Sequence, residues 1–219
     1  MTDLGSTHQE SASQDGTAKS VPASRYLVFF SIVVIGCLTD LATKSWIFSW
    51  LGMPRTRPPW VIWRGFFSLT TSLNEGALFG LGQGWSLGFA ALSIVAAVAI
   101  VAWLFWARAA HEWALTVALA LIMAGIFGNL YDRLGFPGLT WNREMQMGRV
   151  GQPVYAVRDW LLVTVPIVRR EWPIFNLADS MLVVGASLLF LHLWVAQRKL
   201  NAELESTDEP REEAAAVGR

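Results

Sequence analysis

The sequence predicts an all-α integral membrane protein with four transmembrane helices and a small extramembrane β-cradle built from two long loops. Hydrophobic residues make up 53% of the 219 positions, and the 16% that are charged lie mostly between long apolar runs rather than within them. Four of these runs reach the length of about 20 residues that a helix needs to cross roughly 30 Å of hydrocarbon. Runs of this length are typical of membrane spans rather than of a soluble core.

The four apolar runs set the expected spans. The first extends from Tyr26 to about Trp46 and the second from Leu87 to Trp106; the third covers Trp113 to Tyr131 and the fourth Trp172 to Ala196. The second and third contain no charged residue, whereas the first and fourth carry charges near one end. Tryptophans stand at the ends of the runs, where interfacial anchors are expected.

The remaining sequence divides into two tails and three connections. Residues 1–24 are polar and lack apolar periodicity, so we expect a disordered tail, followed by a four-span domain at 25–199 and a polar acidic tail at 200–219. Two connections are long, from about 47 to 83 and from about 133 to 171, and both contain alternating, β-branched stretches bounded by Pro and Gly. Such stretches predict short strands. If all four runs span, both connections lie on one side of the membrane and together form the cradle.

Composition excludes several classes of function. The formal net charge is zero, so no bulk electrostatic attraction favours nucleic acid as a partner. Cys37 is the single cysteine, which rules out an internal disulfide framework. The stretch "HEWAL" at His111 lacks the second histidine of a zinc-protease helix. We expect no metal and no organic cofactor.

Polar side chains gather at four span ends that the antiparallel path of the chain brings to one membrane face. In chain order they are Asp40 and Lys44, Asn74 and Glu75, Asn129, Asp132 and Arg133, and finally Asn176 and Asp179. Each group alone has a structural explanation, such as a helix-end ion pair or a helix cap. Because polar side chains in a membrane turn toward one another, their convergence predicts one polar site near the membrane surface.

Carboxylates dominate this set, and they favour acid–base chemistry. Two acids held close together share a proton and activate a water between them, which is the chemistry of aspartic proteases. The candidate acids are Asp40, Asp132, Asp159 and Asp179. A Ser–Lys nucleophile pair built on Lys44 is disfavoured, because Asp40 four residues earlier keeps the amine protonated.

An ion or proton transporter is the alternative function, since membrane carboxylates often mark ion paths. That class requires polar residues near the midplane, whereas this site lies at one end of the spans. The second and third runs are also uninterrupted, and the sequence has no pair of broken helices.

Five short motifs, in order along residues 25 to 199, resemble those of the bacterial lipoprotein signal peptidases, also called signal peptidase II. They are "DLATK" (40–44), "NEGALFG" (74–80), "GNLYDR" (128–133), "VRDW" (157–160) and "FNLADS" (175–180). The resemblance implies an inner-membrane aspartic endopeptidase that cuts prolipoproteins just before a cysteine that already carries diacylglycerol. It further implies both termini in the cytoplasm and a site near the outer face, although the arginines of the long loops, by the positive-inside rule, favour the reverse. We expect a monomer whose partners are this substrate and membrane lipids.

The resemblance assigns roles to residues of this chain. The catalytic pair would be Asp159 and Asp179, with Asp132, Asn129 and Asn176 supporting them. The residues expected to hold the site and the substrate backbone are Asp40, Lys44, Asn74, Gly76 and Arg133.

The chain also departs from the family pattern. Arg158 replaces the valine that usually precedes the loop aspartate, and an adjacent guanidinium would favour the ionised form of Asp159, setting it as the base. Leu73 stands where an arginine is often found, and the segment 134–152 is an insertion. Asp132 therefore stays open as the alternative first acid.

Overall fold

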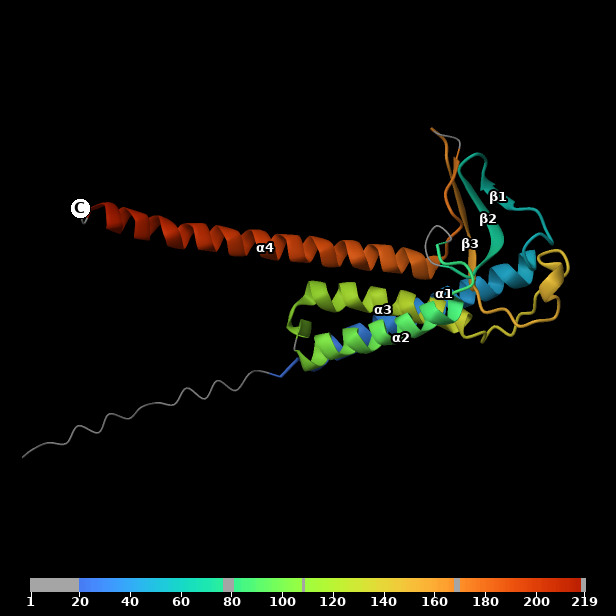
Figure 1. The fold of residues 1–219 in the computed structure, drawn as a ribbon, viewed down its shortest axis with the longest axis horizontal. Helices are drawn as coiled ribbons and strands as arrows, with labels where there is room; N and C mark the ends of the chain where they lie inside the picture. Colours follow the sequence, from blue (N-terminus) through green and yellow to red (C-terminus); the bar gives the residue numbers. More distant parts are fainter. Residues whose placement is uncertain (1–19, 77–80, 108, 168–169, 218–219) are drawn as a thin grey trace, which may run out of the picture.

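Four long helices and a small sheet at one end of them make up the architecture (Figure 1). The computed structural model describes residues 20–76, 81–107, 109–167 and 170–217. The helices are α1 (Ala23–Leu51), α2 (Ser86–Val101, continued by the π-helical η2, Ala102–Trp106), α3 (Trp113–Arg133) and α4 (Leu177–Val217). Two short 3₁₀ turns, η3 (Ala109–His111) and η4 (Met147–Arg149), lie in the connections. Within the described ranges, four helices are long and apolar enough to cross a membrane, as predicted.

The fourth helix begins later and ends later than its apolar run indicates. Residues 172–176 are extended rather than helical, because Pro173 interrupts them and the backbone N–H groups of Trp172 and Phe175 donate to Val163 and Leu161 of the sheet. At the other end, α4 continues to Val217, so most of the predicted polar C-terminal tail is helical. Residues 1–19 of the predicted N-terminal tail lie outside the described residues.

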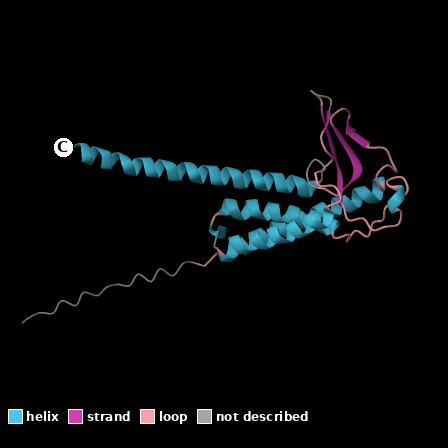
Figure 2. Ribbon diagram, in the orientation of Figure 1, coloured by secondary structure: helices cyan, strands magenta, loops and turns pink. Residues whose placement is uncertain are grey.

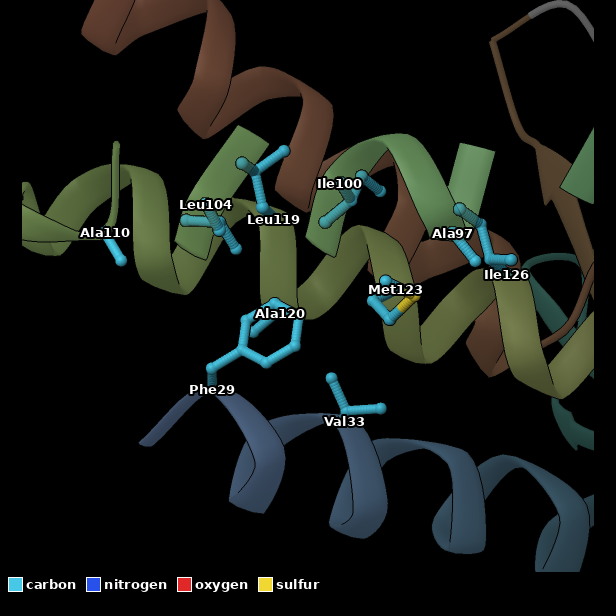
Figure 3. Close-up of a cluster of buried hydrophobic side chains, with 10 residues drawn as sticks. All are labelled: Phe29, Val33, Ala97, Ile100, Leu104, Ala110, Leu119, Ala120, Met123 and Ile126. Carbon is cyan, nitrogen blue, oxygen red and sulfur yellow. The ribbon is translucent and has the colours of Figure 1, made fainter. Parts of the chain in front are cut away.

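The third helix is the centre of the bundle, packing against each of the other three. Figure 3 shows Phe29 and Val33 of α1 directed toward Ala120 and Met123 of α3. Most residues of α3 are buried, whereas the other three helices expose large apolar side chains over most of their surface. In a bilayer those exposed side chains contact lipid. Among the four helices, α3 therefore has the largest share of residues buried inside the protein.

Small residues allow α4 to lie very close to α3. A Cβ atom added to Gly125 would lie 2.5 Å from the carbonyl oxygen of Ala178, and one added to Gly185 would lie 2.7 Å from that of Ala118. Membrane helices lack a hydrophobic force between them and associate instead through such close packing. The α3–α4 contact therefore fixes where α4 begins relative to the bundle.

Replacing Gly185 by leucine is expected to destabilise the protein by about 1–3 kcal/mol, because its side chain meets backbone atoms that cannot move aside. The neighbouring Ala186 is exposed on α4, so Ala186→Leu serves as the matched control and should leave stability unchanged. Thermal unfolding in detergent measures both. Equal melting temperatures for the two variants would contradict this account of the helix contact.

The sheet comes from the two long connections, where strands were predicted (Figure 2). Its strands are β1 (Trp60–Trp63), β2 (Phe67–Asn74), β3 (Val157–Val165) and β4 (Arg170–Glu171), and they are antiparallel in the order β1-β2-β3-β4. The pairing of β2 with β3 sets Ser72 opposite Asp159, after an irregularity between Leu69 and Ser72. This register brings Asp159 to the end of the sheet nearest the helices.

Candidate active site

Asp159 and Asp179 face one cavity of about 430 Å³ between the sheet and the helix bundle. Asp159 comes from β3 and is 2% exposed, while Asp179 lies in the first turn of α4. Asn176 joins them, since its side-chain Nδ2 donates to Asp159 Oδ1 at 2.6 Å and its backbone N–H donates to Asp179 Oδ2 at 3.2 Å. The two acids predicted as a pair are therefore brought together.

Asn129 of α3 fixes the second acid from the other side. Its Nδ2 donates to Asp179 Oδ1 at 2.8 Å, while its Oδ1 accepts from Lys44 Nζ at 3.0 Å and from Asn176 Nδ2 at 3.2 Å. With two donors directed at Oδ1, the amide can present only its NH₂ group to Asp179. Two N–H donors, one from Asn129 and one from the Asn176 backbone, thus stabilise negative charge on Asp179.

A buried group of charges lies behind the cavity. Lys44 Nζ lies 2.7 Å from Asp40 Oδ2 and 3.2 Å from Asp132 Oδ2, and all three side chains are fully buried. Asp40 also accepts the backbone N–H of Ala178 at 2.9 Å, which ties α1 to the start of α4. Neither Asp40 nor Lys44 lines the cavity. Direct contact of these two residues with substrate is therefore not supported by their positions, which instead hold the helices together.

Arg158 contacts Asp132, not Asp159. Its backbone N–H and its Nε each donate to the Asp132 carboxylate at 2.9 Å, and its Nη1 donates to Ser45 Oγ. Neighbouring residues on a strand point to opposite faces, so Arg158 turns away from the acid that follows it. The expectation that Arg158 sets Asp159 as the base is wrong for this reason. Asp132 has both oxygens engaged and lies outside the cavity lining, which leaves Asp159 as the acid that faces Asp179.

Asp159 is the acid that retains its proton. Its pKa is raised to about 8, chiefly by burial and also by the nearby charge of Asp179. Hydrogen bonds from Asn176 and Asn74 oppose this shift without cancelling it. At neutral pH the pair therefore holds a proton on Asp159, which is the arrangement in which one acid donates and the other accepts.

The remaining predicted residues shape the mouth of the cavity. Arg133 lines it and donates from Nη2 to the Gly76 carbonyl oxygen at 3.1 Å, while Asn74 Oδ1 accepts the Gly76 backbone N–H at 2.9 Å. A Cβ on Gly76 would collide with the carbonyl oxygen of Leu81, so the close approach requires glycine. Residues 77–80, the rest of that motif, lie outside the described residues.

Three contributions were not expected from the sequence. Ser72 and Gln83 also line the cavity, and Gln83 donates to Asn74 Oδ1 at 3.4 Å. Arg149 of the segment 134–152 forms a two-pronged ion pair with Glu75, at 2.8 and 3.0 Å. The strand register indicates Ser72, which pairs with Asp159, but no local pattern joins Arg149 to a residue 74 positions earlier. Within the described ranges, no three His, Cys, Asp or Glu side chains group as metal ligands.

Two aspartates bridged by an asparagine, at the end of four membrane-length helices, form the arrangement expected of a membrane aspartic endopeptidase. The family profile described as Signal peptidase (SPase) II matches residues 32–195. The lipoprotein signal peptidase of Rhodopirellula baltica is 43% identical over 192 residues, which cover 86% of this chain and 81% of that protein. The enzyme of the same name from Pseudomonas aeruginosa is 32% identical over 173 residues, covering 76% of this chain and 88% of its own.

Solved structures agree with the sequence relatives. One, described as a bacterial membrane enzyme determined by the in meso method at 2.3 Å resolution, superposes with a TM-score of 0.62 at 26% identity and covers 82% of this chain and 92% of its own. A second, at 1.9 Å resolution, has a TM-score of 0.59, also at 26% identity, and covers 80% and 95%. The chain belongs to the signal peptidase II family.

Proposed function

We propose that Asp159 and Asp179 are the catalytic pair with which this chain cleaves prolipoproteins just before their diacylglyceryl-modified cysteine. Membership of the signal peptidase II family makes the chain a bacterial multi-pass membrane protease that removes signal peptides from prolipoproteins. Nothing in the comparisons supports the transporter alternative. The observation that carries the residue assignment is the bridge from Asn176 to both carboxyl groups.

The hydrogen bonds and burial of the two acids indicate a role for each. Asp179, whose two carboxyl oxygens accept from two N–H donors, takes a proton from a water that attacks the scissile carbonyl carbon. Asp159, protonated, donates a hydrogen bond to the carbonyl oxygen as negative charge develops there. The carbon–nitrogen bond then breaks, and the proton held by Asp179 passes to the departing cysteine amine. The products are the free signal peptide and the lipid-modified chain.

The cavity supplies a route for the substrate. Its deeper wall is formed by Ile126 of α3 and by Leu182 and Val183 of α4, which suit an apolar signal peptide arriving from lipid. Near the acids, Arg133 and Asn74 offer groups that bind a peptide backbone. We propose that the sheet serves as the cradle over which this segment lies, with residues 25–199 as the peptidase domain.

We propose both termini in the cytoplasm, the acids near the outer face of the inner membrane, and a monomer surrounded by lipid. Figure 1 supports the placement of both termini on the side opposite the sheet, because the start of α1 and the far end of α4 lie away from it. Labelling of a cysteine introduced at exposed Arg64 of the β1–β2 turn is expected only from outside the cell. Labelling only from the cytoplasm would reverse the orientation.

The substrate assignment is tested with purified protein and one prolipoprotein prepared with and without diacylglycerol on its cysteine. We expect cleavage of the modified form only, because the acyl chains keep the scissile bond at the depth of the acids. The mass of the released signal peptide locates the cut. Equal cleavage of both forms, or a cut elsewhere, would overturn the assignment.

Cleavage is expected to slow as the pH rises through about 8, the pKa that Asp159 reaches chiefly through its burial. The sign follows from the shift: the folded pKa lies above the ordinary 3.8, so the useful proton is present below about 8 and is lost above it. Asn74→Ala removes a hydrogen bond that favours the ionised carboxyl of Asp159. The pH at which cleavage slows should therefore move higher in this variant. Arg64→Ala, exposed and remote, is the control. A rate that increases through pH 8 would contradict the protonated role of Asp159.

A further inference from the structure

A second groove adjoins the catalytic cavity among the segments outside the membrane-length helices. It has a volume of about 480 Å³ and shares Ser72, Leu73 and Ile174 with the lining of the cavity. Its other walls come from the connection between α1 and β1 and from the inserted segment 134–152. The catalytic steps described above leave this groove without a role.

One side of the groove is an open strand edge. The pairing of β1 with β2 ends at Leu69, because Pro58 and Pro59 precede β1 and have no N–H to extend the ladder. Beyond that point, no described strand pairs with this edge of β2 from Thr70 to Leu73, and these residues are only partly buried. An open edge offers N–H and C=O groups to which an extended peptide can add.

The groove carries positive charge. Exposed Arg55 and Arg57 line it, and each uses one N–H on a backbone carbonyl, of Glu144 and of Trp50 respectively. A guanidinium has five N–H donors, so both keep donors for a ligand. Among the described residues that line the groove, Glu75 is the one acid, and its carboxylate is already paired with Arg149.

The inserted segment adds a buried donor. Trp141 lines the groove, is 7% exposed, and stacks beneath Arg149, whose guanidinium carbon lies 4.4 Å from the ring centre. Its indole N–H has no acceptor among the residues that the structure describes. A buried donor without an acceptor is costly, and a peptide carbonyl in the groove would satisfy it.

We propose that this groove binds the peptide segment that follows the scissile bond, extended along the open edge of β2, and that it favours acidic side chains there. The inference rests on the proposed prolipoprotein cleavage, in which the signal peptide stays in the membrane and the residues after the cysteine pass toward the extramembrane loops. Those residues enter the groove at Ser72 and Leu73, which line both the catalytic cavity and the groove.

The charge preference is tested with synthetic diacylglyceryl lipopeptides that differ only after the cysteine, where they carry glutamates, serines or lysines. With full-length enzyme in detergent, kcat/KM should fall in that order, by about two- to fivefold for each charge that faces an arginine. Arg55→Glu combined with Arg57→Glu should reverse the order while cleaving the serine peptide. Arg64→Glu makes the same charge change on an exposed turn outside the groove and should preserve the order.

Strand pairing is tested by methylating single backbone nitrogens of the serine peptide. Only alternate residues of an added strand donate to the edge, so kcat/KM should fall at every second position and stay constant between them. The same kcat/KM for the glutamate, serine and lysine series, or no alternation on methylation, would overturn the groove while leaving cleavage intact. Failure of the wild-type enzyme to cleave any lipopeptide would instead overturn the proposed function.

Discussion

Asp179→Asn is expected to lower kcat/KM by roughly a thousandfold or more, and Asp159→Asn by a similar factor. Each acid performs a proton step that an amide cannot perform, and general acid–base groups contribute about 10² to 10⁴ in rate. Asparagine has nearly the same shape as aspartate, but its amide has one acceptor oxygen, so Asp179→Asn keeps only one of the two N–H donors, from Asn129 or from the Asn176 backbone. Release of signal peptide from the lipid-modified prolipoprotein measures the effect.

Two comparisons separate chemistry from folding in this experiment. Glu171→Gln neutralises an exposed acid of β4 by the same chemical change and should retain wild-type activity. The aspartate variants should unfold at temperatures close to that of the wild type and still bind the uncleaved substrate. An Asp179→Asn enzyme with wild-type turnover would refute the mechanism. If Asp179→Asn fails to fold, Asp179→Glu takes its place, because glutamate keeps the carboxyl group but moves it away from its position in the wild type.

Replacement of Lys44 by methionine is expected to destabilise the protein by about 3–5 kcal/mol, because it leaves a buried carboxylate without its cation. Asp132 would retain Arg158, but Lys44 is the single cation that the described structure sets against Asp40. Adding Asp40→Asn removes the orphaned charge and should restore most of the stability. Thermal unfolding in detergent compares the single and double variants.

The double variant also separates two roles of Lys44. The amine donates to Asn129 Oδ1, which fixes the amide that holds Asp179, and methionine cannot make this contact. We therefore expect the double variant to fold but to cleave more slowly, with kcat reduced more than KM is raised. A double variant with full activity would show that Lys44 acts on stability alone.

The sequence predicts the elements of this fold better than their contacts. Spans and strands follow from runs of apolar and β-branched residues, which act locally. The start of α4 was misplaced because hydropathy does not distinguish the extended residues 172–176 from the helix that follows. The partner of Arg158 could not be foreseen, since it depends on the face of a strand and on an acid 26 positions away.

The site is predictable where the path of the chain alone brings residues together. It is less predictable where a buried network decides the protonation state of an acid. Antiparallel spans bring Asn129 and Asn176 to one end, and that is enough to predict that they meet the acids. Which acid keeps the proton depends instead on burial, to which β3 and α4 both contribute. No feature of the sequence near Asp159 carries that information.

Asn176, directly before α4, and the first turn of that helix supply the bridge between the two acids, Asp179 itself and the backbone N–H that binds Asp40. All other elements precede this turn along the chain, so a ribosome completes the working centre only after it has made nearly everything else. A chain that has formed three spans holds Asp159 without Asp179. The proposed pair is therefore complete only once the last helix has docked against α3.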